Sequence, residues 1–461
     1  MEYISTRGSA PVLNFRDATL AGLGSDGGLY VPRIWPQFSP TEIAALDGLG
    51  YPETAFRIMR PFVVGSLDDA TLKRLIASAY GDFGHAAVAP LVQLDHRHWL
   101  LELFHGPTLA FKDIALQLLG GMFAEFIDKS RDLTIVGATS GDTGSAAIQA
   151  VAGRAGIAIF MLHPAGRVSD VQRRQMTTIQ AANVHNIAID GTFDDAQALV
   201  KALFNDAAFR ARYNLSAVNS INWARLLAQI VYYFHAAVRL GAPEKRINFA
   251  VPTGNFGDVY AGYAAAQMGL PIGRLLVATN VNDILSRALN QGDYSVGSIT
   301  QTATPSMDIQ VSSNFERLLF DLHGRDGAAC AAAMAGFEAT GQMALTADQR
   351  EQASALFLAE TVGEDRMMQS LRWAWSQCGQ LIDPHTAIGL AAARTHAGRL
   401  NGQIVTLATA HPAKFPDAVE RSAGVRPPLP RRIAHIFERA ERYERLPADI
   451  NALKAYIAGT A

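Results

Sequence analysis

Residues 133–151 read LTIVGATSGDTGSAAIQAV, and this stretch decides the fold class. An apolar run at 133–137 ends in a loop of Gly, Ser, Thr and Asp, and an Ala-rich helical pattern follows. Further β-type runs, most of which end in the same way, lie at residues 157–162, 183–189, 247–251, 275–279 and 404–408. Strand, glycine-rich turn and helix in alternation are typical of an α/β protein with doubly wound parallel sheets. Such sheets bind ligands at the carboxyl ends of their strands, so we expect the site in these loops.

The patterns change along the chain and predict three domains. Residues 1–90 mix turns with short helical stretches and form an N-terminal unit. Residues 131–239 form a small α/β domain. Residues 91–130 and 240–461 form a large domain, in which an Ala-rich helical elaboration occupies about 312–397.

The composition restricts the class of protein. Of the 461 residues, 49 % are hydrophobic and 18 % are charged, so the chain can bury a large core. A formal net charge of -2 gives no basic surface for nucleic acid or an anionic membrane. The two cysteines, Cys330 and Cys378, are far apart, which excludes a disulfide scaffold or a zinc finger and favours the reducing cytoplasm. No apolar stretch is long enough to cross a bilayer, so we expect a cytoplasmic protein with a small-molecule partner.

Three histidines are close in sequence, but they do not have the spacing of a metal site. His96 and His98 flank Arg97 in a polar turn, and we interpret both as solvated. His105 adjoins the turn before Lys112 and is placed to approach a substrate. We expect no metal.

Lys112 is a lysine in an apolar context. A strand at 99–104 runs into the turn HGPT, and the helix that follows carries Lys112 near its start. Burial lowers the pKa of a lysine, and a neutral amine is what a Schiff-base lysine needs. The alternative is an ordinary lysine that pairs with Asp113 or extends out of the helix end. The other candidate, Lys414 in HPAKFPD, lies between two prolines and suits a positioning role better.

The loop after the run at 247–251 resembles a phosphate site. It reads PTGNFGD, residues 252–258, and a helical pattern follows. Two glycines three apart, before a helix amino terminus, let backbone N–H groups converge on a phosphate. The spacing is neither the dinucleotide G-x-G-x-x-G nor a Walker A loop. An ordinary strand-to-helix turn explains the same residues.

Two further loops carry hydroxyl groups at strand ends. Residues 138–144, ATSGDTG, open a helix and suit a carboxylate or a phosphate, although a simple helix cap by Asp142 or Thr143 is compatible with the same pattern. Thr409 ends the last strand, where its hydroxyl can contact a neutral ring nitrogen or bond to the backbone. A cofactor with an aldehyde, a phosphate and a ring nitrogen uses all these features together. Pyridoxal 5'-phosphate (PLP) is such a cofactor.

The motifs resemble those of the threonine synthases of bacteria and fungi, a family of fold-type II PLP enzymes. The matching segments are MEYISTRG (1–8), DGGLYVP (26–32), HGPTLAFKD (105–113), GATSGDTGSAA (137–147), SINWARLLAQIVYY (220–233), VPTGNFGD (251–258), DPHTA (383–387) and TAHPAKF (409–415). They occur in family order over residues 1–415. The resemblance implies a tryptophan synthase β-like fold with two doubly wound parallel-sheet domains, an N-terminal unit and a helical insertion.

The resemblance also implies the activity. The family converts O-phospho-L-homoserine and water into L-threonine and phosphate, by γ-elimination and β-addition of water in the last step of threonine biosynthesis. Lys112 would bind the PLP aldehyde and then serve as a base, and Thr409 would face the pyridine nitrogen. The residues that would hold the PLP phosphate are Gly254, Asn255, Phe256, Gly257 and Asp258.

The substrate would be bound by two segments. Ser140, Asp142 and Thr143 would receive its carboxylate. Asp142 departs from the asparagine usual in fold-type II enzymes, and a carboxylate would repel the phenolic oxygen of PLP, so the group that contacts this oxygen stays unassigned. The substrate is strongly anionic, and Arg225 with Asn222, in SINWARLLAQ, are the candidates for its phosphate, although a surface arginine is an equal alternative.

Three other functions compete with this hypothesis. A serine/threonine dehydratase would share Lys112 and the phosphate loop. A non-catalytic small-molecule binding protein on the same scaffold would lack a reducible bond to Lys112. A nicotinamide oxidoreductase lacks its sequence motif here. For the assembly, we expect a monomer or a homodimer.

Overall fold

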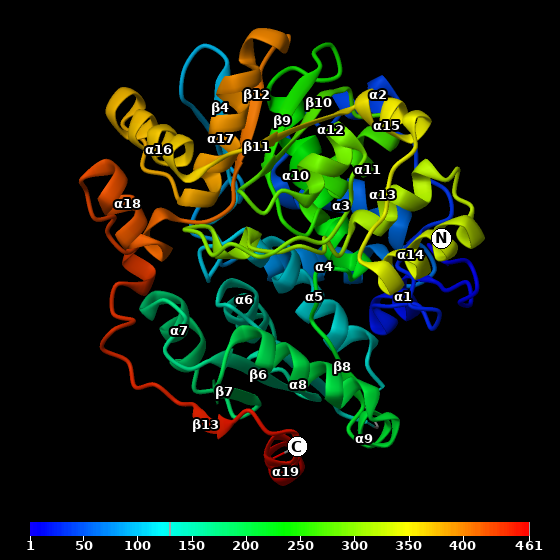
Figure 1. The fold of residues 1–461 in the computed structure, drawn as a ribbon, viewed down its shortest axis with the longest axis vertical. Helices are drawn as coiled ribbons and strands as arrows, with labels where there is room; N and C mark the ends of the chain where they lie inside the picture. Colours follow the sequence, from blue (N-terminus) through cyan, green and yellow to red (C-terminus); the bar gives the residue numbers. More distant parts are fainter. Residues whose placement is uncertain (129–130, 461) are drawn as a thin grey trace.

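The computed structural model describes residues 1–128 and 131–460 and contains two large sheets, one above the other in Figure 1. The upper sheet has the strand order β11-β10-β9-β12-β4-β3 and is parallel except for β3, which runs antiparallel to β4. Its strands are β3 (Leu91–Gln93), β4 (His98–Glu102), β9 (Ile247–Pro252), β10 (Ile272–Thr279), β11 (Phe357–Thr361) and β12 (Ile404–Ala408).

The lower sheet is parallel throughout and has the order β13-β7-β6-β5-β8. Its strands are β5 (Leu133–Ala138), β6 (Ile157–Pro164), β7 (Val184–Asp190), β8 (Leu215–Ser216) and β13 (Glu444–Pro447). The six β-type runs of the sequence all lie in strands of these two sheets, which confirms the predicted fold class of two doubly wound parallel sheets.

Side chains of successive strand residues point to opposite faces, so each sheet is covered by helices on both sides. In β9, Phe249 and Val251 belong to the main core with helices α10 (Trp223–Arg239) and α11 (Gly257–Gln267), whereas Ala250 belongs to a second core with α16 (Glu364–Cys378) and α17 (Pro384–His396). In the lower sheet, Ile135 faces the main core, and Val136 faces a third core with α8 (Phe193–Asn205) and α19 (Ile450–Thr460). The main core is therefore shared by the facing sides of the two sheets.

The helices are distributed over the whole chain. They are α1 (Phe15–Ala21), α2 (Pro40–Ala44), α3 (Tyr51–Val63), α4 (Asp69–Tyr80), α5 (Lys112–Phe126), α6 (Asp142–Val151), α7 (Asp170–Thr177), α8 (Phe193–Asn205), α9 (Ala207–Arg212), α10 (Trp223–Arg239), α11 (Gly257–Gln267), α12 (Ile284–Gln291), α13 (Phe315–Leu322), α14 (Gly327–Thr340), α15 (Ala347–Ser354), α16 (Glu364–Cys378), α17 (Pro384–His396), α18 (Pro416–Ala423) and α19 (Ile450–Thr460). Helix α5 packs on α4 and α10 and also on α6 of the lower sheet, so it joins the two halves.

The N-terminal residues form a small unit of their own. Strands β1 (Tyr3–Ser5) and β2 (Tyr30–Pro32) pair antiparallel, and α3 and α4 pack on α10 and α5. Helix α3 begins beside Pro52 and contains Pro61, and no helix was predicted there. Pro52 lies in the first turn, where proline is favourable, and the buried apolar residues explain why the helix continues past Pro61.

Two segments differ from the sequence prediction. The helical elaboration at 312–397 also contains strand β11, which pairs with β10 at the edge of the upper sheet. Residues 240–461 do not all belong to the large domain, because β13 pairs with β7 and α19 packs on α8 in the lower sheet. The strand sequence ERLP has one apolar aliphatic residue, so no local pattern predicts it. The remaining domain boundaries stay a prediction.

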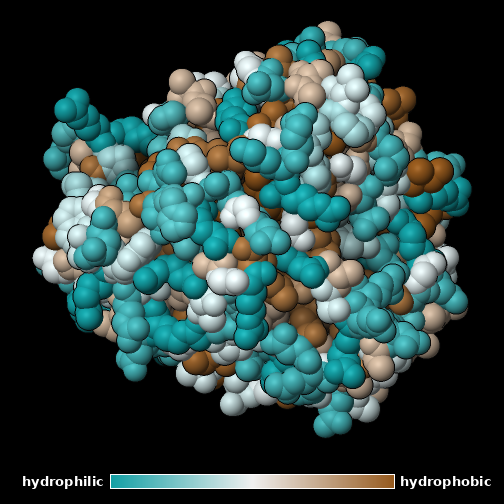
Figure 2. Space-filling view, turned by 90° about the horizontal axis from the view of Figure 1, so that it is seen from above, coloured by the Kyte–Doolittle hydropathy of each residue, from teal (hydrophilic) through white to brown (hydrophobic). Residues whose placement is uncertain are grey.

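The surface agrees with the composition. Figure 2 shows a mostly hydrophilic face with hydrophobic residues scattered among the polar ones. Within residues 1–128 and 131–460, no helix is both long and apolar enough to span a lipid bilayer.

Candidate active site

Lys112 is the first residue of α5, and its amine lies inside the protein. The side chain is 12 % exposed, and its Nζ donates to Oδ2 of Asp142 at 3.4 Å. Asp113 is not its partner, because that carboxylate accepts hydrogen bonds from the backbone N–H and the hydroxyl of Thr108 at 2.8 and 2.7 Å. The alternative in which Lys112 pairs with Asp113 or extends into solvent is therefore wrong.

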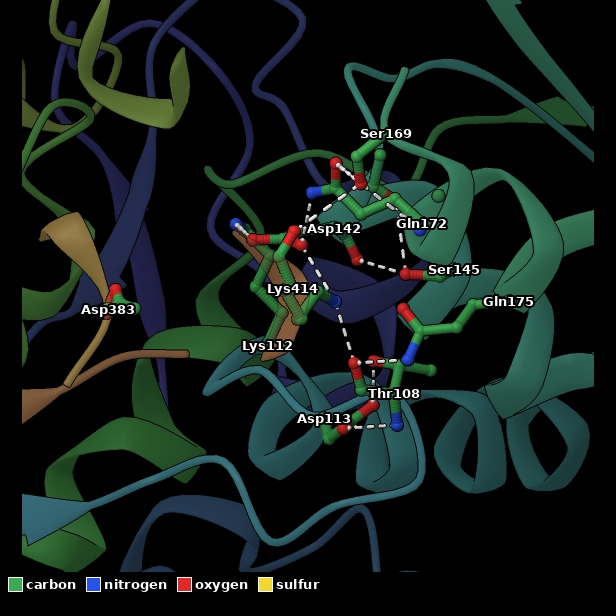
Figure 3. A network of polar contacts seen from close by, with 12 residues as sticks. Thr108, Lys112, Asp113, Asp142, Ser145, Ser169, Gln172, Gln175, Asp383 and Lys414 are labelled. Atoms are coloured by element: carbon green, nitrogen blue, oxygen red, sulfur yellow. Dashed lines mark hydrogen bonds and ion pairs between the residues drawn. The ribbon is translucent and has the colours of Figure 1, made fainter. Parts of the chain in front are cut away.

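Asp142, the first residue of α6, has three polar partners (Figure 3). Its Oδ1 is 2.8 Å from Nζ of Lys414 and accepts a 2.8 Å hydrogen bond from Nε2 of Gln172, while Oδ2 faces Lys112. Burial by itself raises the pKa of a carboxyl, but the two lysines and these hydrogen bonds hold the pKa of Asp142 far below its usual range. Asp142 is therefore ionised.

The surroundings of Lys112 favour its neutral form. Burial lowers the pKa of the Lys112 amine, Asp142 raises it in part, and the positive charges of Lys414 and Arg225 lower it again. The net effect is a pKa below that of a lysine in water. A lysine of this kind can act as a nucleophile or a base near neutral pH.

Backbone pairing brings Thr409 next to this lysine. The N–H of Phe111 donates to the carbonyl of Thr409 at 2.8 Å, and the N–H of His411 donates to the carbonyl of Leu109 at 3.0 Å. The end of β12 therefore lies against the turn that precedes Lys112. The structure brings together two residues that are almost 300 positions apart in sequence, as a shared site requires.

The loop between β9 and α11 is braced from the segment before α13. Ser312 Oγ donates to the carbonyl of Gly254 at 2.8 Å, and Ser313 Oγ donates to Oδ1 of Asn255 at 3.1 Å. The N–H of Phe256 donates to the hydroxyl of Thr253 at 3.2 Å. These contacts give the loop one defined shape.

This shape opens α11 at the carboxyl end of β9, the edge of the sheet at which β4 and β12 also end. Phe256 has φ = 60°, in the left-handed region, and α11 begins at the next residue, Gly257. A Cβ on Gly254 would lie 3.1 Å from the carbonyl oxygen of Ser306, and one on Gly257 would lie 3.2 Å from Nδ2 of Asn314, so both positions leave little room for a side chain. The first N–H groups of an α-helix have no helical acceptor and attract an anion.

Asp258 has a different position from the one predicted. Its Oδ1 accepts hydrogen bonds from the hydroxyls of Tyr232 and Tyr233 on α10, the second at 3.2 Å. Burial raises the pKa of Asp258 to about 7. Its carboxyl is directed to α10, and only its backbone N–H is left for a phosphate.

The loop between β5 and α6 is organised by one hydroxyl. Thr139 Oγ1 accepts hydrogen bonds from the N–H groups of Gly141 and Gly144, both at 2.9 Å. Gly141 has φ = 137°, which strongly favours glycine. Ser140 and Thr143 are half-buried in this loop, next to Asp142.

Arg225 and Asn222 have separate roles. Asn222 caps α10 by accepting from the N–H of Ala224 at 3.0 Å, and its Nδ2 donates to the carbonyl of Thr19 at 2.8 Å. Both ends of its side chain are thus used within the fold, which argues against a substrate contact. Arg225 is 4 % exposed, and its Nε and Nη1 have no hydrogen-bond partner among the described residues. Burial lowers the pKa of Arg225 to about 10.

The histidines differ from the sequence interpretation in one respect. His96 is exposed, as expected, but His98 is buried, and its Nδ1 is 2.9 Å from Oδ2 of Asp95. The alternation of β4 turns this side chain inward. His105 pairs with Glu102 at 2.7 Å. Over residues 1–128 and 131–460, no group of three or more His, Cys, Asp or Glu side chains is placed to hold a metal.

Two contributors to the site had little local signal. Gln172 lies on α7 of the lower sheet, and nothing in its sequence context indicates that it binds Asp142. Lys414 is fully buried, and its apolar context between Pro412 and Pro416 was the signal for a positioning role.

The residues present fit PLP. A buried amine of lowered pKa can bind its aldehyde, and the helix terminus at 254–257 can hold its phosphate. Thr409 lies beside the turn that precedes Lys112, and its hydroxyl is of the kind that can meet the ring nitrogen. The unpartnered guanidinium of Arg225 needs an anion, because a buried charge without a hydrogen-bond partner is costly.

Comparisons with known proteins agree with this site. Residues 2–80 match the model described as Threonine synthase N terminus, residues 85–410 match Pyridoxal-phosphate dependent enzyme, and residues 386–457 match Threonine synthase, C-terminal. A threonine synthase of Pseudomonas aeruginosa is 54 % identical over 99 % of this chain and 98 % of its own.

Solved structures give the same result. The crystal structure of PLP-bound threonine synthase from Brucella melitensis has a TM-score of 0.98 and 50 % identity, and the match covers 100 % of this chain and 99 % of that one. Tomato threonine deaminase has a TM-score of 0.52 and 12 % identity over 77 % of this chain and 93 % of its own, so it shares the fold alone. The matched models, the full-length relatives and the geometry around Lys112 agree, and the chain belongs to the threonine synthase family of pyridoxal-phosphate-dependent enzymes.

Proposed function

We propose that this chain converts O-phospho-L-homoserine and water into L-threonine and inorganic phosphate, with PLP bound through Lys112. The observation that carries the proposal is the position of this amine. It is buried, it has a lowered pKa, and it contacts Asp142 at the start of α6. The strand before it, β4, is parallel to β12, which is parallel to β9, so the loop that opens α11 follows at the same edge of the sheet.

The cofactor would be held by Lys112, by the N–H groups at the start of α11 and by Thr409. When bound, PLP supplies an aldehyde that condenses with an amine and a ring that accepts electrons from the substrate Cα. The N–H groups at the start of α11 hold its phosphate, with Gly254, Asn255 and Phe256 shaping the loop. Asp258 contributes its N–H alone, because its carboxyl is bonded to the tyrosines of α10. Thr409 offers an uncharged hydroxyl to the ring nitrogen.

Lys112 is the base that moves protons in the reaction. In its uncharged form, Nζ of Lys112 would take the proton from the substrate Cα, and it would take a proton from Cβ only after it has released the first one. Asp142, 3.4 Å away, stabilises the ammonium that forms. The same ammonium can return a proton later in the cycle.

Arg225 and the loop at 140–143 bind the substrate anions. The guanidinium of Arg225 has two donor atoms without a partner, and a phosphoryl group can accept from both. The half-buried hydroxyls of Ser140 and Thr143 and the amino terminus of α6 suit the substrate carboxylate. Asn222 supports this site as the cap of α10.

Sodium borohydride and peptide mapping test the proposal. The purified holoenzyme should absorb visible light, lose this band on reduction, and carry the label on Lys112. It should release phosphate from O-phospho-L-homoserine and form threonine. Label on another lysine contradicts the assignment of Lys112. Deamination of serine or threonine without phosphate release supports a dehydratase, and a colourless protein after incubation with PLP supports a binding protein.

We also propose that the enzyme works in the cytoplasm as a monomer or a homodimer, which the balanced charge and the two unpaired cysteines support. Light scattering of the purified chain measures the assembly, and a larger oligomer would contradict it.

A further inference from the structure

A second lysine shares the carboxylate of Asp142 with Lys112. Nζ of Lys414 is 2.8 Å from Oδ1, and Nζ of Lys112 is 3.4 Å from Oδ2 (Figure 3). Lys414 also donates to the carbonyl of Thr108 at 2.7 Å, and its side chain is fully buried. Of the two lysines, Lys414 thus makes two short polar contacts, whereas Lys112 makes one longer contact.

The charges in this cluster do not balance if both lysines are ammonium ions. Among the residues that the structure describes, Asp142 is the one carboxylate bonded to them, and Arg225 adds a further positive charge toward Lys112. Asp113 lies near Lys414 and Arg432 but is satisfied by Thr108. In a buried site, a single carboxylate stabilises one ammonium ion well. A second ammonium ion there is disfavoured.

We infer that Lys414 is a positioning residue that holds the charge of Asp142, so that Lys112 stands beside this ion pair as an uncharged amine. The geometry selects which lysine is the ammonium, because Lys414 has a carboxylate and a carbonyl within 2.8 Å. The inference rests on the proposed role of Lys112, since only an amine with a free electron pair can bind the cofactor aldehyde.

Lys414 is built into the site through the backbone. It ends the short 3-10 helix Pro412–Lys414, directly after the segment at 409–411 that pairs with residues 109–111. The same pairing holds the backbone before Lys112 against the backbone before Lys414, so both side chains reach Asp142, one at each carboxylate oxygen. A shift in this segment would change both contacts together.

The test measures the titration of Lys112 in the apoenzyme. Trace acylation by acetic anhydride over a pH series, followed by peptide mass spectrometry, reports the neutral fraction of each lysine. In Lys414→Met, Asp142 is left to Lys112, so we expect its neutral fraction near neutral pH to fall by about tenfold or more. Lys414→Arg keeps the charge and should stay within about twofold of the parent chain.

The double variant Asp142→Asn/Lys414→Met removes both charges and should restore the neutral fraction of Lys112 to the parent level. A purely structural role for Lys414 predicts the opposite, namely a double variant at least as impaired as Lys414→Met. Lys454→Met is the matched control, because it removes another lysine paired with an aspartate, Asp206 at 2.6 Å, far from the site. An unchanged titration in Lys414→Met overturns the inference.

Lys414→Gln is the second variant, for the case in which Lys414→Met does not fold. Its neutral amide can still donate to Asp142 and Thr108, and we expect the same loss for Lys112. In the holoenzyme, the pH dependence of the visible absorption provides a second readout. Borohydride mapping tests the proposed function by itself, and apoenzyme labelling tests this inference without the cofactor, so the failure of one is distinct from the failure of the other.

Discussion

The loops after β9 and β5 have the same local pattern but bind charge in different ways. Each loop follows a parallel strand, contains glycines and opens a buried helix. The loop after β9 sends its carboxyl, Asp258, away to α10 and presents backbone N–H groups. The loop after β5 keeps its carboxyl, Asp142, in the site. Lys112 and Lys414, which follow strands β4 and β12 of the upper sheet, contact it there.

This difference shows what a strand-to-helix loop needs in order to keep a charge in a buried site. A backbone cradle is neutral and attracts an anion by itself. A buried carboxylate requires cations from elsewhere, and Asp142 obtains them from α5 and from the segment at 412–414. The loop after β5 therefore depends on cations that the packing of the two sheets brings to it, whereas the loop after β9 needs no cation, although distant serines hold its shape.

The largest effect is expected at the lysine between the two loops. Lys112→Ala removes the amine that binds the cofactor aldehyde and serves as base, so threonine formation should fall by at least about a thousandfold. The visible absorption of the bound cofactor should change as well, while the fold remains. Lys201→Ala, at an exposed position on α8, is the control and should keep full activity. Ordinary turnover in the Lys112 variant would remove the central assignment.

A smaller effect is expected at the arginine that faces the site without a partner. Arg225→Met removes a charge-assisted contact to the substrate phosphoryl group, so KM for O-phospho-L-homoserine should rise about 10–100-fold. The cofactor absorption should change little. Arg239→Met, at the far end of α10, is the matched control. If KM does not change, Arg225 has a structural role alone.

Alanine substitutions in the two loops compare them directly. Gly141→Ala forces φ = 137° on an alanine and places Cβ within 2.6 Å of the Gln172 side chain, so it should lower kcat/KM by about tenfold or more.

In Gly254→Ala, the added Cβ meets neighbours at 3.1–3.2 Å. It should weaken PLP binding by about three- to tenfold, measured by absorbance titration.

Gly336→Ala, with nothing within 4 Å of the added Cβ, is the control for both. A larger loss of kcat/KM from Gly254→Ala than from Gly141→Ala would reverse the comparison.

The smallest effect on activity is expected at Asp258, where stability should depend on pH. Burial raises its pKa to about 7, whereas an unfolded aspartate titrates near 4. Between these values the folded chain holds a proton that the unfolded chain has lost, so the contribution of this group to the free energy of unfolding falls as pH rises.

Asp258→Asn has no such titration. Its stability relative to the parent chain should therefore increase by about 2–4 kcal/mol from the acidic to the alkaline side of this window. Urea unfolding at a pH on each side measures it. An equal difference at both pH values would show that the carboxyl is ionised in the fold throughout.

By itself, the sequence determined the six apolar strands of the alternating pattern, the loops that end them and the residue types in those loops. These features are local, since apolar runs form strands and glycine before a helix leaves free N–H groups. It also singled out Lys112 and Arg225 by their apolar context, Lys414 by its two flanking prolines, and Thr409 as a hydroxyl at a strand end.

Only the tertiary structure decided which of these groups meet. It paired Lys112 with Asp142 rather than Asp113, directed Asp258 to α10, and used Asn222 as a helix cap. It also added β13 to the lower sheet. Contacts between residues distant in sequence depend on how the sheets pack and on which charges are buried together, and a local pattern carries no information on either.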